Sequence, residues 1–113
     1  MRFELRYVLP ISLLCGVMAL APLRAMAADS AAGKAVFDAK CKSCHAADGA
    51  GNPAIAKMMK IEMKPLGSAD VQKKSDAELK AVVTMGEGKM KPVTTVTGAD
   101  LDNVVAYVRS MKK

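Results

Sequence analysis

Apolar residues recur at helical spacing between residues 30 and 40. Such spacing predicts an amphipathic helix, and Asp29 or Ser30 can cap its first turn. Gly33 is unusual inside a helix, where glycine costs about 1 kcal/mol relative to alanine. It is either merely tolerated or marks the close approach of another backbone, with Phe37 one turn later on the same face. The apolar positions are Ala32, Ala35, Val36 and Ala39.

A second helical pattern lies near the C-terminal end, where apolar residues follow the i, i+3, i+4, i+7 spacing. Thr97 and Asp100 before it resemble a capping box with aspartate in place of glutamate. A helix with one apolar face needs a partner, and the helix that contains Gly33 offers one. This pairing favours close approach at Gly33 over a tolerated glycine. The stripe consists of Leu101, Val104, Val105, Val108 and Met111, flanked by Tyr107.

A third helix is predicted between these two. Ser75 and Glu78 form a capping box, and Gly86 and Gly88 end the helix. Its apolar positions are Leu79, Val82 and Val83.

Residues 46–74 are predicted to form loops and short helices, because glycine and proline recur along them. We expect one short helix over residues 54–61. No alternating β pattern precedes Cys41, and the chain as a whole is predicted to be all-α. The breaking residues are Gly49, Gly51, Pro53, Pro65 and Gly67.

Residues 1–27 are predicted to be a secretory signal peptide, and residues 28–113 the mature domain. Two arginines precede a largely apolar stretch over residues 7–21, and Ala25 and Ala27 supply the small residues of a cleavage site. An uncleaved membrane anchor is the alternative, but a span needs about 20 apolar residues. We therefore expect export to the periplasm, and no integral membrane protein once the signal is cleaved.

The charge pattern does not favour nucleic acid as a partner. The full sequence has a formal net charge of +6, but its lysines are dispersed. The only aromatic residues of the mature part are Phe37 and Tyr107. With no internal repeat and a length that suits one small domain, the protein is expected to be a monomer.

The chemistry of the chain centres on residues 41–45, Cys-Lys-Ser-Cys-His. This C-x-x-C-H run is the attachment site of a c-type haem. Two thiols at this spacing can each add to one porphyrin vinyl group, and the histidine then supplies a neutral imidazole to the iron. A thioredoxin-type dithiol needs a strand-helix-strand context, and a structural zinc site needs one ligand more. We therefore predict one haem c, covalently bound through Cys41 and Cys44, with His45 as an iron ligand.

His45 is the only histidine of the chain, so the second axial ligand is a methionine, a lysine, water or an open position. Met85 and Met111 are predicted to fill the core. Met90 lies in a loop that begins with glycine and is stiffened by proline, between two helices. The competing candidates come from the middle segment and are Met58, Met59 and Met63.

The mature sequence resembles, over essentially its whole length, the class I monohaem cytochromes c of the small soluble bacterial type. The resemblance rests on Gly33 and Phe37, on residues 41–45, on the 86–90 loop, and on residues 101–108 with Tyr107. It implies about three to five helices around one covalent haem. The first and last helices would cross through their glycine and aromatic positions.

The resemblance also implies roles for single residues. His45 would be the proximal ligand and Met90 the distal ligand. Pro53 is the match for a proline whose carbonyl accepts a hydrogen bond from Nδ1 of the ligand histidine, a contact that fixes the ring. Many relatives have proline directly after the methionine, whereas here Lys91 comes before Pro92.

An iron with two strong axial ligands has no free position for substrate, which favours an electron-transfer protein over an enzyme. The predicted function is a periplasmic single-electron carrier between respiratory redox partners. The alternatives are a haem sensor or enzyme with a labile sixth ligand, and a haem-free thiol-disulfide oxidoreductase. Lys40, Lys42, Lys89 and Lys91 would steer partners with acidic docking surfaces, or are ordinary solvated lysines.

Overall fold

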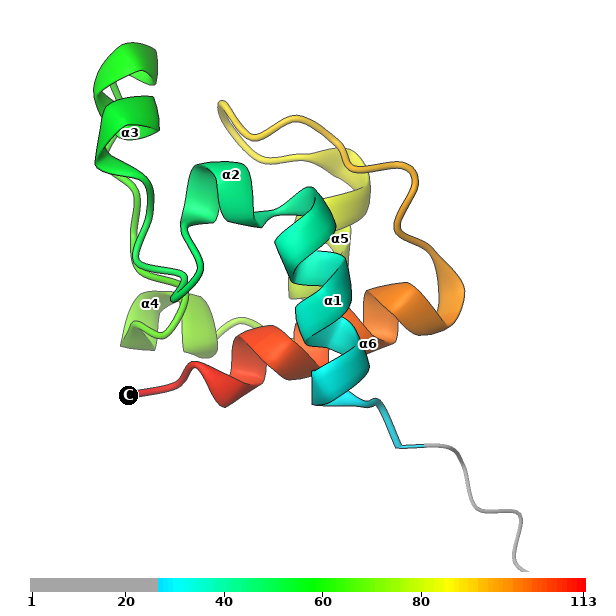
Figure 1. Ribbon diagram of the computed structural model, residues 1–113. Coiled ribbons are helices and arrows are strands. Elements are labelled where there is room, and N and C mark those ends of the chain that lie inside the picture. The colour runs from blue at the N-terminus through cyan, green and yellow to red at the C-terminus, as the bar shows by residue number, and fades with distance from the viewer. Residues whose placement is uncertain (1–26) are drawn as a thin grey trace, which may run out of the picture.

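The computed structural model describes residues 27–113, which form six helices and no β-strand (Figure 1). The all-α prediction is confirmed. There are six helices, more than the expected three to five, because two of them are single turns of four residues. The helices are α1 (Ser30–Lys40), α2 (Lys42–His45), α3 (Pro53–Met59), α4 (Ala69–Gln72), α5 (Asp76–Met85) and α6 (Gly98–Ser110).

The predicted signal peptide lies outside the described residues, apart from Ala27. Within residues 27–113, none of the helices has both the length and the apolar character that a bilayer crossing requires.

Helices α1 and α6 cross in direct backbone contact. A Cβ atom at Gly33 would overlap the backbone carbonyl oxygen of Asn103 and lie 3.0 Å from Cβ of Tyr107. One turn along α1, the rings of Phe37 and Tyr107 meet edge to face, with centroids 5.2 Å apart and planes inclined by 64°. The close approach predicted at Gly33 is therefore present.

The buried face of α1 is narrower than its apolar pattern indicates. Gly33 and Phe37 are buried and Val36 is half-buried, but the three alanines of the predicted stripe are exposed. Where two helices cross in backbone contact, the partner helix buries only the residues at positions i and i+4 that face it. Residues at other positions around the helix stay exposed to solvent. The exposed alanines are Ala32, Ala35 and Ala39.

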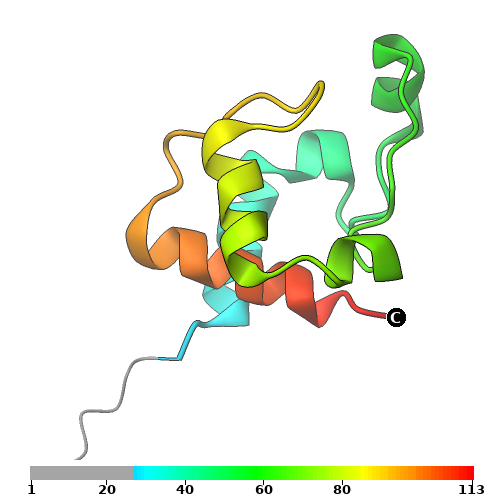
Figure 2. The same cartoon turned by 180° about the vertical axis from the view of Figure 1, so that it is seen from behind.

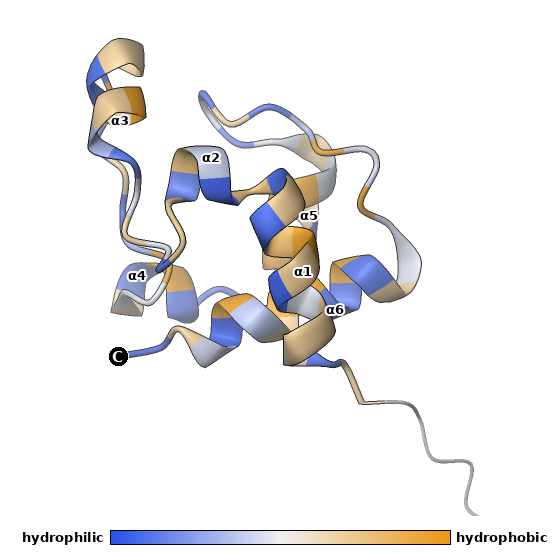
Figure 3. Cartoon of the chain, viewed as in Figure 1, coloured by the Kyte–Doolittle hydropathy of each residue, from blue (hydrophilic) through white to orange (hydrophobic). Residues whose placement is uncertain are grey.

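The core lies where α1, α5 and α6 meet. Its buried centre consists of Phe37, Val96 and Val104, and half-buried apolar side chains such as Val83 and Leu101 pack around it. Figure 3 shows hydrophobic ribbon on α1 and α5, and also on α3, which stands apart from the other helices. The core therefore forms without α3.

The helix ends follow the sequence signals in part. Ser75 and Glu78 form the predicted capping box at α5, with bonds of 3.1 and 2.8 Å. Thr97 is the N-cap residue of α6, but the predicted capping box is not formed, because the Thr97 side chain makes no capping bond. Gly98 begins α6 with φ of 56°, so its first turn is irregular. Helix α3 is shorter than the predicted 54–61 because Lys60 has left-handed φ of 55°.

Arg109 joins the last helix to the connection between α4 and α5. Its guanidinium donates to the carbonyl of Gln72 at 2.7 Å and to that of Lys74, and it pairs with Asp76 at 2.9 Å. The side-chain amide of Gln72 in turn donates to the carbonyl of Val108 at 2.9 Å. These bonds fix the register of α6 against the segment that precedes α5.

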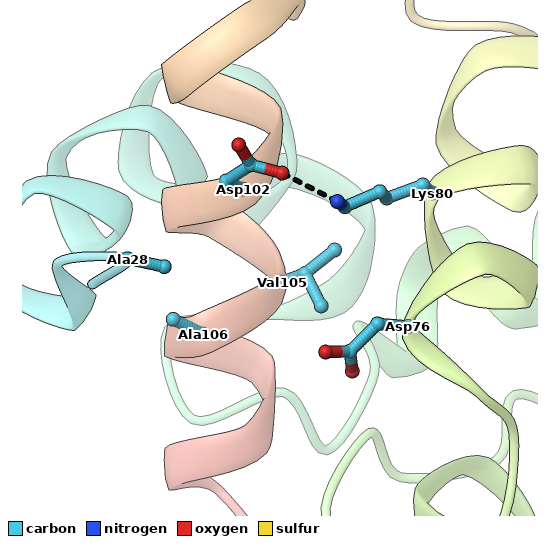
Figure 4. Close-up of a pocket in the computed structure, with 6 residues that line it drawn as sticks. All are labelled: Ala28, Asp76, Lys80, Asp102, Val105 and Ala106. Carbon is cyan, nitrogen blue, oxygen red and sulfur yellow. Dashed lines mark ion pairs between the residues drawn. The ribbon is translucent and has the colours of Figure 1, made fainter. Parts of the chain in front are cut away.

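Figure 4 shows the face between α5 and α6, with Ala28 before α1 on the other side of α6. Lys80 of α5 and Asp102 of α6 form an ion pair of 2.5 Å across it. Beside the pair lies a shallow pocket of about 240 Å³, lined also by Ala28 and Val105. Both charged side chains are exposed, so this pair is screened by solvent and adds little to stability.

Candidate haem-binding site

The C-x-x-C-H motif forms a single helical turn directly after α1. The amide of Cys41 donates to the carbonyl of Phe37 at 2.8 Å, so the turn begins at the buried end of the helix crossing. Cys41 caps α2, which carries Cys44 and His45. Both cysteines are half-buried free thiols. Burial, and secondarily the neighbouring Cys44, raise the pKa of Cys41, which keeps its thiol uncharged at neutral pH.

The imidazole of His45 has the properties of a metal ligand. Burial lowers its pKa, so the neutral form dominates at pH 7. Its Nδ1 atom is buried and has no hydrogen-bond partner among residues 27–113. A buried polar atom without a partner costs about 1–3 kcal/mol. Two thiols and a neutral imidazole on one turn, with a ring nitrogen left unsatisfied, fit a covalent haem.

The hydrogen bond expected between Nδ1 of His45 and the carbonyl of Pro53 is not formed in this structure. Pro53 is exposed and occupies the first turn of α3. Carbonyl groups in a first turn point along the helix toward the amide four residues later. The carbonyl of Pro53 is therefore directed into α3 rather than back to the motif.

Met90 lies in a tightly folded loop between α5 and α6. Its backbone forms an antiparallel bridge with Glu87, with N–O distances of 2.9 and 3.0 Å. A Cβ atom at Gly86 would lie 2.5 Å from the carbonyl oxygen of Met90 and 3.0 Å from Cδ of Pro92. The side chain of Met90 is half-buried. The predicted loop of glycine and proline around Met90 is therefore present, and only glycine fits at position 86.

Figures 1 and 2 show this loop at the same end of the molecule as α2. The amide of Val93 donates to the carbonyl of Val83 at 2.7 Å, which folds the chain after Met90 back onto α5. The structure thus brings the segment that carries Met90 and the turn that carries His45 to one end of the fold.

The remaining methionines differ from one another in burial. Met111 is half-buried against the core, as predicted. The prediction that Met85 fills the core is wrong: its side chain is 71% exposed, because α5 ends there and turns away at Gly86. Met58 is 70% exposed on α3. Met63 lies against Gly51, whose Cβ would be 2.9 Å from that of Met63.

Sequence reasoning missed Asn52. Its backbone amide donates to the carbonyl of Cys44 at 2.8 Å, and its side-chain amide donates to the carbonyl of Ser43 at 3.2 Å. The side-chain oxygen also caps α3 by accepting from the amide of Ala54 at 3.0 Å. An asparagine directly before a proline is a helix N-cap signal, so this last contact was visible in the sequence.

Comparison with known proteins gives the family of this site. Residues 30–112 match the family model described as Cytochrome c. The chain belongs to the cytochrome c family. The match covers all six helices and confirms the resemblance drawn from the sequence motifs.

Two proteins named cytochrome c6 are similar to this cytochrome c. The one from Rippkaea orientalis (strain PCC 8801 / RF-1) is 34% identical over 88 residues, covering 74% of this chain and 72% of the relative. The one from Picosynechococcus sp. (strain ATCC 27264 / PCC 7002 / PR-6) is 36% identical over 90 residues, covering 74% of each. Among solved structures, the KustC0563 c-type cytochrome matches with a TM-score of 0.61 and 24% identity, over 72% of this chain and 98% of that one. At that identity the likeness shows the fold alone.

Membership of the family defines the cofactor. Cytochromes c hold haem covalently through cysteines, and in this chain Cys41 and Cys44 of the motif attach one haem c. The protein is accordingly a monohaem electron carrier, and electron-transfer proteins are its partners.

Proposed function

We propose that this cytochrome c is a periplasmic single-electron carrier between respiratory redox partners, with His45 and Met90 as the two axial iron ligands. The bound haem supplies reversible one-electron chemistry, and a His/Met ligand pair raises its potential. The observation that carries the proposal is the fixed position of Met90: the Glu87 bridge and the contacts of Gly86 hold its backbone at the end of the fold where His45 lies.

The packing of Met63 favours Met90 as the second ligand. Met63 lies against Gly51, and the amide of Gly51 donates to the carbonyl of His45 at 2.8 Å. Met63 thus packs beside the segment that follows the histidine, whereas the second ligand must come from the opposite side of the ring. Met90 is on a separate segment, between α5 and α6, and is therefore the candidate that does not pack beside the residues following His45.

The location belongs to the proposal as well. It is supported by the sequence of residues 1–27, with its positive start, apolar stretch and Ala-Met-Ala ending. An exported chain would meet oxidising conditions, in which two close thiols tend to form a disulfide. Covalent attachment of haem removes both thiols of the motif from that reaction.

Replacing Met90 with alanine tests the proposed ligand. We expect Met90→Ala to make the ferric iron high-spin or to let water or a lysine bind. The Fe–S charge-transfer absorption should disappear and the reduction potential should fall, because a thioether favours Fe(II). Oxidised and reduced absorption spectra and a redox titration of the purified protein measure these changes.

Met85→Ala is the matched control, because Met85 is exposed and lies five residues before Met90. It should leave the spectrum and the potential unchanged. If Met90→Ala keeps the wild-type spectrum and Met58→Ala, Met59→Ala or Met63→Ala destroys it, the ligand assignment is wrong. If the wild-type iron is already five-coordinate, a haem sensor or enzyme replaces the carrier.

Four exposed lysines support the proposal that the redox partners have acidic docking surfaces. They flank the haem motif and Met90, and within the described residues none of them lies within 4 Å of a carboxylate. Lys34 of α1 and Lys80 of α5 are ion-paired, as is Lys74, which lies between α4 and α5. The four that flank the motif and Met90 are Lys40, Lys42, Lys89 and Lys91; within residues 27–113, Lys57, Lys60, Lys112 and Lys113 also have no carboxylate within 4 Å.

If these lysines steer partners, the reduced protein should be oxidised faster by an anionic iron complex such as hexacyanoferrate(III) than by a cationic oxidant of similar driving force. The difference should shrink with added salt, since the Debye length is about 8 Å at physiological ionic strength. Stopped-flow kinetics measure both rates. Lys40→Glu/Lys89→Glu should reduce the preference more than Lys112→Glu/Lys113→Glu, which changes the net charge equally at the C-terminal end. Equal effects of the two double variants would mean that the preference for the anionic oxidant depends only on the net charge of the protein.

A further inference from the structure

The haem-binding turn α2 is too short to satisfy its own backbone. Its carbonyl groups lie at the end of a four-residue helix, where no further turn exists to donate to them. The chain leaves the helix sharply, because Ala46 has φ of 63°, in the left-handed region. The carbonyls of Ser43, Cys44 and His45 must therefore find donors outside α2.

Those donors come from two consecutive residues. The amide of Gly51 donates to the carbonyl of His45 at 2.8 Å, and the amide of Asn52 donates to that of Cys44 at 2.8 Å. The carbonyl of Ser43 accepts from Nδ2 of Asn52 at 3.2 Å. Two of the three bonds use backbone amides and do not depend on a side-chain donor. The bond to Ser43 is the one that depends on a side chain.

The same side chain also begins the next helix. Oδ1 of Asn52 accepts from the amide of Ala54 at 3.0 Å and caps α3. The amide group therefore donates to the end of α2 and accepts from the start of α3. A carboxylate can only accept, and it would face the carbonyl of Ser43 with a second negative group. A serine hydroxyl can cap α3 but sits one bond from Cβ and is too short to reach Ser43.

We propose that the side-chain amide of Asn52 is a positioning group for the haem-binding turn: it closes the carbonyl end of α2 and thereby fixes the orientation of His45 beneath the haem. Asn52 acts through Ser43, and its side chain forms hydrogen bonds with the backbone of Ser43 and Ala54 rather than with the thiols or the imidazole. This role goes beyond the carrier function and does not depend on which methionine binds the iron.

The test compares Asn52→Ser with Asn103→Ala in the haem-loaded protein. Asn52→Ser keeps the cap of α3, because serine is a strong N-cap residue, and loses the bond to Ser43. We expect hydrogen exchange of the amides of residues 44–46 to accelerate several-fold, while exchange in α3 stays as in the wild type. The reduction potential and the ferric axial-ligand spectrum should shift in the same variant.

Asn103→Ala is the matched control, since it removes an asparagine side chain that accepts from the amide of Asp29 at 2.8 Å, at the far end of α1. It should change neither exchange in residues 44–46 nor the potential. Wild-type exchange and potential in Asn52→Ser would overturn the proposal, as would equal changes in Asn103→Ala. Should Asn52→Ser fail to mature, Asn52→Asp keeps the size and the cap. Asn52→Asp must then show the same faster exchange of the amides of residues 44–46. Exchange at the wild-type rate in Asn52→Asp would also overturn the proposal.

Discussion

Replacing both cysteines of the motif, Cys41→Ser/Cys44→Ser, should yield a protein without covalently bound haem. A serine hydroxyl does not take the place of the thiol that adds to a porphyrin vinyl group, so neither bond can form. The purified double variant should show no haem stain after denaturing electrophoresis, and its mass should equal that of the polypeptide alone. The wild type should keep its haem under the same conditions.

The double variant should also lose stability. Cys41 packs against the core cluster, and its amide bonds to Phe37 at the helix crossing, so the haem is attached where the core begins. A small domain buries a limited fraction of its surface and gains much from a large apolar group. Thermal unfolding followed by circular dichroism measures the loss.

Ser43→Ala is the control for the cysteine variant, because Ser43 lies between the two cysteines and its side chain is exposed. It should retain haem and the wild-type spectrum. Haem that survives denaturing electrophoresis in the double-serine variant would contradict attachment through Cys41 and Cys44. A colourless wild type from a host able to mature c-type cytochromes would instead revive the thiol-disulfide alternative.

The parts of the fold that were predicted correctly are those with local causes. The bounds of α1, α5 and α6 follow from helical periodicity and, for α5, from the Ser75 capping box. The crossing of α1 and α6 was predictable because the apolar C-terminal helix needed a partner and the helix that contains Gly33 offered one. The haem motif needs only five consecutive residues, so its chemistry could be read without any knowledge of the fold.

The parts that were missed depend on contacts between distant segments. The excursion that carries α3 is closed by one backbone bond, from the amide of Leu66 to the carbonyl of Gly49 at 2.9 Å. Met111 of the C-terminal segment lies against that same glycine. No periodic pattern in the sequence predicts such a closure. Glycine and proline indicate a loop, but they do not indicate which distant residues the loop contacts.

The side-chain errors have the same origin. Met85 has the apolar character of a core residue, but the turn at Gly86 leaves it in solvent. Asn52 could be recognised as the cap of α3, yet its bond to Ser43 depends on the left-handed turn at Ala46. For alanine, which rarely adopts that conformation, the sequence carries no signal of it.

Gly33→Ala should destabilise the protein by about 2–3 kcal/mol, although alanine is the better helix former by about 1 kcal/mol. The added methyl group would overlap the backbone carbonyl oxygen of Asn103. A backbone oxygen inside α6 cannot rotate aside, so the two helices must separate. Their separation would loosen the contact between Phe37 and Tyr107, whose rings are 5.2 Å apart.

Chemical denaturation of the haem-loaded protein, followed by far-ultraviolet circular dichroism, measures the free energy of unfolding. Ala32→Ser is the matched control, because it adds one atom to the neighbouring, exposed position of α1 and should change stability by no more than about 0.5 kcal/mol. Greater stability of Gly33→Ala would mean that helix propensity outweighs packing at this position. The helices would then have to pass with room for a side chain between them, contrary to the close approach of Gly33 to the carbonyl of Asn103.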